Sequence, residues 1–281
     1  MSDNYWQPVG EGYPQSPSQR TGTSEMMPNP YAEPQWLQPV AQAHMQCPRF
    51  EKPLGGKILF HAALIVVATS VVVLFGLSIL LSLLLGVSDD VGFFKILVLT
   101  LGLHSAVTLT CLWWLLKFHK VSREQIGAVP LGPRRWHLLW QLPLVVIIAV
   151  GMQLIIFGVF QAPEPVAQAQ LADGVASVGF GYFPFWFIGV AIFTPLWEEL
   201  FFRGIFFNVA RNKWGFTAAV IITSLVFALA HMTPVLIPYL FVLGVAAALL
   251  RNFHGSLVAS VALHMTVNSI ASAAVFATMV A

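Results

Sequence analysis

The second half of the chain places carboxylate, imidazole and amide side chains within strongly apolar runs. These residues are Glu198, Glu199, Arg203, His231, His264 and Asn268. Carboxylates and imidazoles are the groups that most often move protons in catalysis, and an amide can donate a hydrogen bond to a developing negative charge. The six residues therefore predict acid–base chemistry, provided that the surrounding segments bring them together.

Helical spacing divides the two adjacent glutamates into different predicted roles. Glu199 and Arg203 are four residues apart, so they share one face of a helix and are expected to form an ion pair. Glu198 is turned by about 100° from Glu199, which leaves its carboxylate free to point elsewhere. His264 and Asn268 are also four apart and should face one direction. We therefore expect Glu199 to be structural and Glu198 to be reactive.

Composition indicates the solvent in which these residues must work. Of 281 residues, 57% are hydrophobic and 9% are charged, whereas an ordinary soluble domain has about 25% charged residues. This predicts an all-α, polytopic membrane protein, and the net charge of +2 gives no indication of a nucleic-acid partner. Residues 1–52 are rich in Pro, Gln and Ser and are expected to form a disordered cytosolic tail before a transmembrane domain over 53–281.

Long apolar runs alternate with short polar breaks from residue 58 onward, and about 20 apolar residues suffice to cross a bilayer as a helix. We expect about seven spans, with eight as the alternative, in a bundle that encloses a polar intramembrane cavity. The fifth and sixth runs are short and are separated by "TPVLIP", so they could form a tight hairpin. The expected spans are 58–86, 92–117, 137–160, 183–209, 216–232, 235–250 and 256–280.

Basic residues mark every second loop between these spans, and the intervening loops carry only acidic charges. Because cytoplasmic loops are enriched in Lys and Arg, this predicts a cytosolic N-terminus and a C-terminus on the other side. The expected location is a multi-pass position in a membrane, the plasma membrane for a bacterial chain. The basic residues are Arg49, Lys52, Lys57, Lys117, Lys120, Arg123, Arg134, Arg135, Arg211, Lys213 and Arg251.

The basic anchors also predict the depth of the polar residues. At 1.5 Å of rise per residue, Glu198 and His264 each lie about 20 Å from the nearest anchor along their helices, and His231 about 27 Å. Three helices should therefore bring a carboxylate and two imidazoles to similar heights. Intramembrane carboxylates and histidines can also mark an ion path, so this layer fits an enzyme or an ion-coupled transporter.

Three short motifs carry a family resemblance: "EELFFR" (198–203), "FALAH" (227–231) and "HMTVN" (264–268). In this order they resemble the EExxxR, FxxxH and HxxxN/B motifs of the CAAX protease and bacteriocin-processing family of intramembrane proteases, also called the Abi family. The resemblance covers about residues 180–275. It implies an all-helical membrane bundle with a conical polar cavity and the hydrolysis of a peptide bond by the six residues named above.

The chemistry expected from this resemblance is direct attack by water, because the chain has no HExxH or GxSxG motif. We assign the general base to Glu198, with His231 orienting and polarising the water. His264 and Asn268 are expected to donate hydrogen bonds to the oxyanion. Glu199 and Arg203 would hold the helix and contact the substrate backbone or its terminal carboxylate.

Cofactor and substrate stay open at this stage. Two histidines and a glutamate can form a catalytic zinc site, here Glu198, His231 and His264, although an asparagine favours a cofactor-free, metal-independent mechanism. The expected partners are the lipid bilayer and a hydrophobic, lipidated or membrane-associated peptide. The competing functions are a non-proteolytic scaffold or immunity protein and, less well supported, a transporter, because the chain has no internal repeat or paired broken helices.

Overall fold

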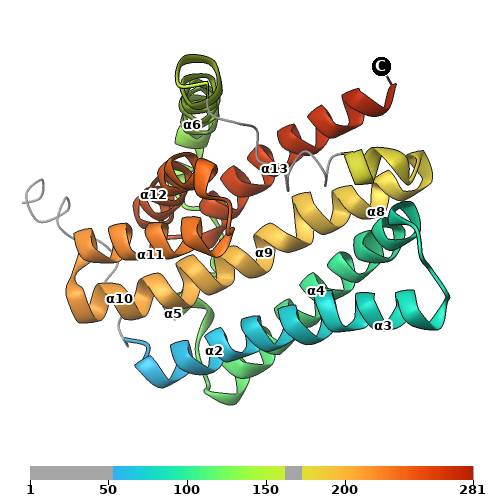
Figure 1. The fold of residues 1–281 in the computed structure, drawn as a ribbon. Coiled ribbons are helices and arrows are strands. Elements are labelled where there is room, and N and C mark those ends of the chain that lie inside the picture. The colour runs from blue at the N-terminus through green and yellow to red at the C-terminus, as the bar shows by residue number, and fades with distance from the viewer. Residues whose placement is uncertain (1–52, 162–172, 281) are drawn as a thin grey trace, which may run out of the picture. The chain divides into compact units, whose positions relative to one another are not determined.

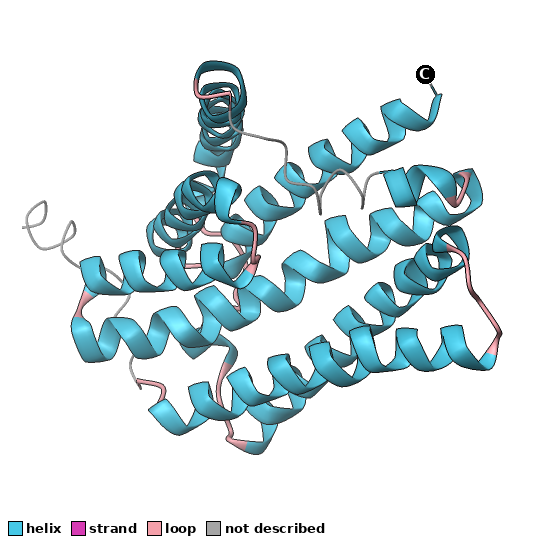
Figure 2. Cartoon of the chain, in the orientation of Figure 1, coloured by secondary structure: helices cyan, strands magenta, loops and turns pink. Residues whose placement is uncertain are grey.

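The computed structural model describes residues 53–161 and 173–280, except for the side chain of Thr278. Within these residues every regular element is a helix (Figure 2), which confirms the predicted all-α class. The predicted disordered tail, residues 1–52, lies outside the described part of the chain.

Six helices are long and apolar enough to cross a membrane: Gly56–Leu84, Asp90–Phe118, Pro133–Val159, Phe180–Trp214, Pro234–His254 and Leu257–Ala277. They correspond to six of the seven predicted spans. The exception is α11 (Phe216–Ala230), whose 15 residues are fewer than the roughly 20 that a bilayer requires. The described bundle therefore has six candidate spans and one short apolar helix, where about seven spans were predicted.

Several of these helices join α-helical and π-helical pieces end to end. The first contains α2 (Gly56–Thr69), η1 (Ser70–Gly76) and α3 (Leu77–Leu84), and the second is α4 (Asp90–Phe118). After the short α5 (Arg123–Ile126), the third contains η2 (Pro133–His137), α6 (Leu138–Gln153) and η3 (Leu154–Val159). The last two are α12 (Ile237–His254), which follows the short η7 (Pro234–Leu236), and α13 (Leu257–Val280).

The longest helix runs through the middle of the bundle (Figure 1). It starts with η4 (Phe180–Tyr182) and α8 (Phe183–Phe187), continues through η5 (Ile188–Phe193), α9 (Thr194–Glu199) and η6 (Leu200–Phe206), and ends with α10 (Phe207–Trp214). The two motif glutamates thus occupy a short α-helical piece between two π-helical pieces. Such π-helical turns occur frequently at functional sites.

The outer surface of the bundle is apolar. Leu83, Leu84 and Phe118 each leave more than seven-tenths of their surface exposed, and large exposed apolar areas are typical of surfaces that contact a membrane or a partner. Most of the exposed apolar side chains lie on the same helices that are long enough to span a bilayer. Both observations fit a bundle whose outside faces lipid.

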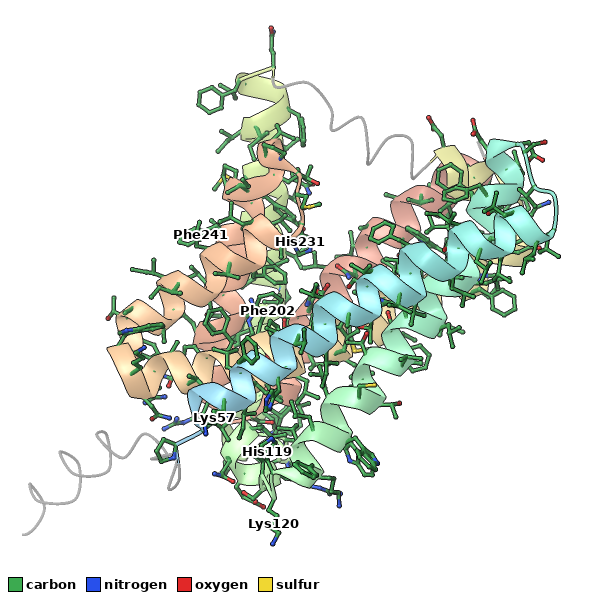
Figure 3. All side chains as sticks on the ribbon, turned by 60° about the horizontal axis from the view of Figure 1, so that its bottom comes forward. Lys57, His119, Lys120, Phe202, His231 and Phe241 are labelled. Carbon is green, nitrogen blue, oxygen red and sulfur yellow. The ribbon has the colours of Figure 1, made fainter. Side chains whose placement is uncertain are left out.

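The loops with basic residues meet at one end of the bundle. The amide of Leu54 donates to Asn208 at 3.3 Å, and the Asn208 amide in turn donates to the Gln125 carbonyl at 2.7 Å. The amide of Leu257 donates to the Gly127 carbonyl at 2.7 Å. Figure 3 shows Lys57, His119 and Lys120 together at this end, with His231 away from them. The alternation of loop charge in the sequence therefore corresponds to two ends of one bundle.

Helices α11 and α12 form the antiparallel hairpin that the sequence predicted, with η7 at its turn (Figure 1). Their backbones approach closely at Gly244, where an added Cβ atom would lie 2.9 Å from the Cβ of Ser224. Because a glycine has no side chain at this position, α11 can pack directly against α12.

Gly244→Ala should therefore lower the thermal unfolding temperature of the protein in detergent micelles. Overpacking of this kind costs about 1–3 kcal/mol. The matched control is Gly102→Ala, where an added Cβ meets no atom within 4 Å and should be neutral or stabilising by helix propensity. Equal unfolding temperatures for the two variants would contradict the close packing at Gly244.

Candidate active site

A cavity of about 790 Å³ is lined by α4, the α8–α9 segment, α12 and α13, and also by residues of η1, α6 and η3. Glu198, His231, His264 and Asn268 all line it, so the predicted common layer is present in the fold. Most of the other lining side chains are apolar, including Leu101, Trp186, Leu240 and Val275. The space is thus an apolar chamber with a polar patch on its wall, instead of the polar cavity that the sequence predicted.

The imidazole of His264 lies between the two motif glutamates. Its Nδ1 is 3.0 Å from Oε1 of Glu199, and its Nε2 is 3.5 Å from Oε2 of Glu198. Glu199 is fully buried, while Glu198 and His264 keep 9% and 3% of their surface. One ring therefore connects a fully enclosed carboxylate with a second carboxylate that borders the cavity.

This geometry corrects one sequence-based prediction. The rotation of about 100° between neighbouring helical residues suggested that Glu198 would point away from the surroundings of Glu199. Both carboxylates instead reach the same imidazole, because its two nitrogens lie on different edges of the ring. His264, which was predicted to serve the oxyanion, is thus the imidazole beside the carboxylate that was predicted to be reactive.

The predicted ion pair between Glu199 and Arg203 is confirmed. Arg203 Nη1 donates to Glu199 Oε1 at 2.8 Å, and Nη2 donates to the carbonyl of Gly244 in α12 at 3.1 Å. Its guanidinium carbon lies 4.6 Å from the ring centroid of Phe227 in α11. Because a buried charge needs a partner, this one arginine holds the central helix against both arms of the hairpin.

Phe227 is the site residue that sequence reasoning did not include. Its ring centroid lies 4.7 Å from that of His231 and 5.6 Å from that of His264, and its side chain is 1% exposed. The signal was present in the spacing of "FALAH", because residues four apart lie on one helix face. Phe227 therefore packs against both imidazoles and helps to fix the position of each.

His231 ends α11 as its C-terminal cap residue. Its Nδ1 lies 2.8 Å from the carbonyl oxygen of Phe227. A carbonyl can only accept, so Nδ1 carries the proton and, in the neutral ring, Nε2 is an acceptor. His231 contributes this nitrogen to the cavity wall from the tip of the hairpin.

Asn268 connects α13 to the central helix. Its Nδ2 donates to the backbone carbonyl of Val190 at 2.9 Å, within the π-helical segment η5. An amide nitrogen has two hydrogens, so one remains for another acceptor. The asparagine thus combines a positional contact with a donor at the cavity wall.

The predicted zinc ligands are not arranged as a preformed metal site. In the parts of the chain that the structure describes, no three His, Cys, Asp or Glu side chains are grouped closely enough to hold one ion. Glu198, His231 and His264 line the same cavity, and the ring of Phe227 contacts both imidazoles. We therefore derive no catalytic step through a metal.

The fold and the site together define a polytopic membrane protein with a buried acid–base centre between its spans. Residues 180–270 match the family model "Type II CAAX prenyl endopeptidase Rce1-like", in agreement with the CAAX protease resemblance that the motifs carry. At the level of the family, the match supports a CAAX-type membrane endopeptidase.

One curated relative gives a second comparison. The chain is 29% identical over 164 residues to an "Uncharacterized 24.3 kDa protein" of Escherichia coli, a match that covers 56% of this chain and 73% of that protein. No solved structure matches the chain.

Breaking the buried ion pair should destabilise the fold strongly. In Arg203→Met, Glu199 keeps its charge without the guanidinium, which costs about 3–5 kcal/mol, so the amount of folded protein in membranes and the unfolding temperature should fall. The exposed Arg123→Met is the control. The double variant Glu199→Gln/Arg203→Met should recover part of the loss, and a double variant less stable than Arg203→Met would contradict the pairing.

Proposed function

We propose that this chain is an intramembrane endopeptidase in which Glu198 activates a water molecule against a peptide bond. The observation that carries the proposal is the His264 ring between Glu198 and Glu199 at the cavity wall, inside the segment that matches an endopeptidase family. The arrangement combines a carboxylate near the cavity with an imidazole of fixed orientation, which general acid–base catalysis requires.

The two glutamates have different roles in this mechanism. Glu199 is fully buried and its charge is compensated by Arg203, so it stays ionised. It accepts a hydrogen bond from the Nδ1–H group of His264. Glu198 borders the cavity, and in the described residues its Oε2 atom has no hydrogen-bond donor. Glu198 is therefore available to take a proton from water.

The proton path follows from the order of the groups. Glu198 takes a proton as the water oxygen forms its bond to the carbonyl carbon of the substrate. His264 Nε2, 3.5 Å from Glu198 Oε2, receives this proton and donates it to the peptide nitrogen as the carbon–nitrogen bond breaks. Glu199 fixes the Nδ1 proton, which leaves Nε2 unprotonated for this exchange, in the way that a carboxylate orients the histidine of a catalytic triad.

The remaining residues complete the site. His231 Nε2 can accept a hydrogen bond from the attacking water and so orient it, because its Nδ1 proton is engaged by Phe227. The free amide hydrogen of Asn268 can bind the oxyanion. His264 can serve as a second donor to the oxyanion only while Nε2 carries the transferred proton. Glu199 and Arg203 hold His264 and the helices and take no direct part.

The proposed substrate is a hydrophobic, lipidated or membrane-associated peptide. A volume of about 790 Å³ with mainly apolar walls is within the usual range of ligand pockets and suits apolar side chains or a lipid chain. We also propose that the end of the bundle with the basic loops faces the cytosol, because positive loops are retained there. The N-terminus would then be cytosolic, in the plasma membrane of a bacterial cell.

Glu198→Gln should abolish cleavage while leaving the fold intact, since the amide keeps the shape of the side chain but cannot take the proton. Cleavage of a library of fluorogenic hydrophobic peptides by purified protein measures this, with Glu124→Gln, on the exposed helix α5, as the matched control. Retained cleavage in the Glu198 variant would refute the assignment of the base. If the wild type cleaves no peptide, the non-proteolytic scaffold becomes the better function.

The mechanism also predicts activity without a metal ion. Metal analysis of purified, active protein should find substoichiometric zinc, and phenanthroline should leave the turnover rate unchanged. Inhibition by phenanthroline that added zinc reverses would show that the protein is a metalloprotease, with Glu198, His231 and His264 as the ligands to test.

A further inference from the structure

Helix α13 presents a third polar residue to the cavity beyond those already assigned. His264, Asn268 and Ser272 follow one another at intervals of four residues, and all three line the cavity. Residues at this spacing share one helix face. Ser272 is 1% exposed, and the mechanism above does not use it.

The central helix places a second polar side chain at the level of Ser272. Asn268 contacts Val190, and Phe276 packs on Phe183 with 4.9 Å between ring centroids, so the two helices run antiparallel with a known register. Ser272 is halfway between 268 and 276, and Trp186 is halfway between 183 and 190. Trp186 also lines the cavity and packs in the same apolar cluster as Val275, one turn beyond Ser272.

Both side chains carry a donor that the described residues leave unsatisfied. Trp186 Nε1 and Ser272 Oγ are buried without a hydrogen-bond partner, as is Oε2 of Glu198 in the same cavity. Buried polar groups normally find a partner, and those that do not often have a functional reason. Two such donors at one level of a substrate cavity indicate a place for a hydrogen-bond acceptor.

The charge of the cavity wall selects the kind of acceptor. The described lining residues include no lysine or arginine, so a carboxylate at this level would be buried without a compensating cation, which is costly. A neutral backbone carbonyl carries no such penalty. Ser272 is eight residues from His264, about 12 Å along α13, and an extended peptide covers that distance in about three to four residues.

We propose that Trp186 and Ser272 form a subsite that binds a backbone carbonyl of the substrate peptide, three to four residues from the bond that is cut. The subsite rests on the proposed peptidase function and deepens it. It holds the peptide in an extended conformation along α13. It favours a peptide whose chain continues past the subsite over one that ends there in a free carboxylate.

The test compares peptide binding and turnover in Trp186→Phe and Ser272→Ala, which remove one donor each and keep most of the side chain. For a fluorogenic peptide that the wild type cleaves, KM should rise about 2- to 10-fold in each variant, the loss expected for one neutral hydrogen bond, with kcat nearly unchanged. Trp114→Phe and Ser82→Ala, which do not line the cavity, are the matched controls.

A peptide with an ester in place of the amide at the third or fourth residue from the cut bond supplies the second measurement. Its weaker carbonyl acceptor should raise KM in the wild type but have no further effect in the two variants. Unchanged KM in both variants, or equal sensitivity of wild type and variants to the ester, would overturn the subsite. A requirement for a free C-terminal carboxylate that Ser272→Ala removes would overturn the neutral acceptor.

Binding of the same labelled peptides to Glu198→Gln separates this inference from the proposed function. If Trp186→Phe or Ser272→Ala, added to the Glu198→Gln variant, weakens binding, the subsite is supported even where no preparation cleaves a peptide. Absence of cleavage would then refute the peptidase function but not the subsite. Cleavage by the wild type together with unchanged binding in those variants would refute the subsite alone.

Discussion

The buried charge of Glu199 is the constraint on which the rest of the site depends. An ionised carboxylate with no exposed surface needs opposite charge and hydrogen-bond donors, and it finds them in Arg203 on its own helix and His264 on α13. Arg203 in turn needs acceptors, and it binds the Gly244 carbonyl of α12 and the face of Phe227 in α11. Compensating one charge thereby fixes four helical segments relative to one another.

The π-helical segments around α9 contribute to the same arrangement. The carbonyl of Val190, in η5, accepts its hydrogen bond from a side chain, the amide of Asn268. The π-helical segment before Thr194–Glu199 thus gives the central helix a hydrogen bond to α13 about two turns before the glutamates. The π-helical backbone of η5 and the position of Asn268 are therefore linked by one hydrogen bond.

The α11–α12 hairpin places His231 at the C-terminal end of α11. Helix α11 stops at His231, and the turn that follows brings Thr233 and Leu236 to the cavity wall as well. The close contact between Gly244 and Ser224 holds α11 against α12, so that Phe227 and His231 come from a closely packed hairpin. In the proposed function, this apolar chamber would accept a hydrophobic chain and bring one peptide bond to the polar groups on its wall.

The sequence by itself determined the helical class, the positions of six of the long helices, the hairpin and the residues that gather at the cavity. These follow from local properties: the length of apolar runs, the period of 3.6 residues, and the scarcity of charge. The pairing of Glu199 with Arg203 was predictable for the same reason, because both lie on one helix at a fixed spacing. What the tertiary structure alone decided was which imidazole meets which carboxylate. His264 is 65 residues from Glu199 in the sequence. The rotation of α13 about its axis depends on its packing against Val190 and Phe227, which helical spacing does not fix.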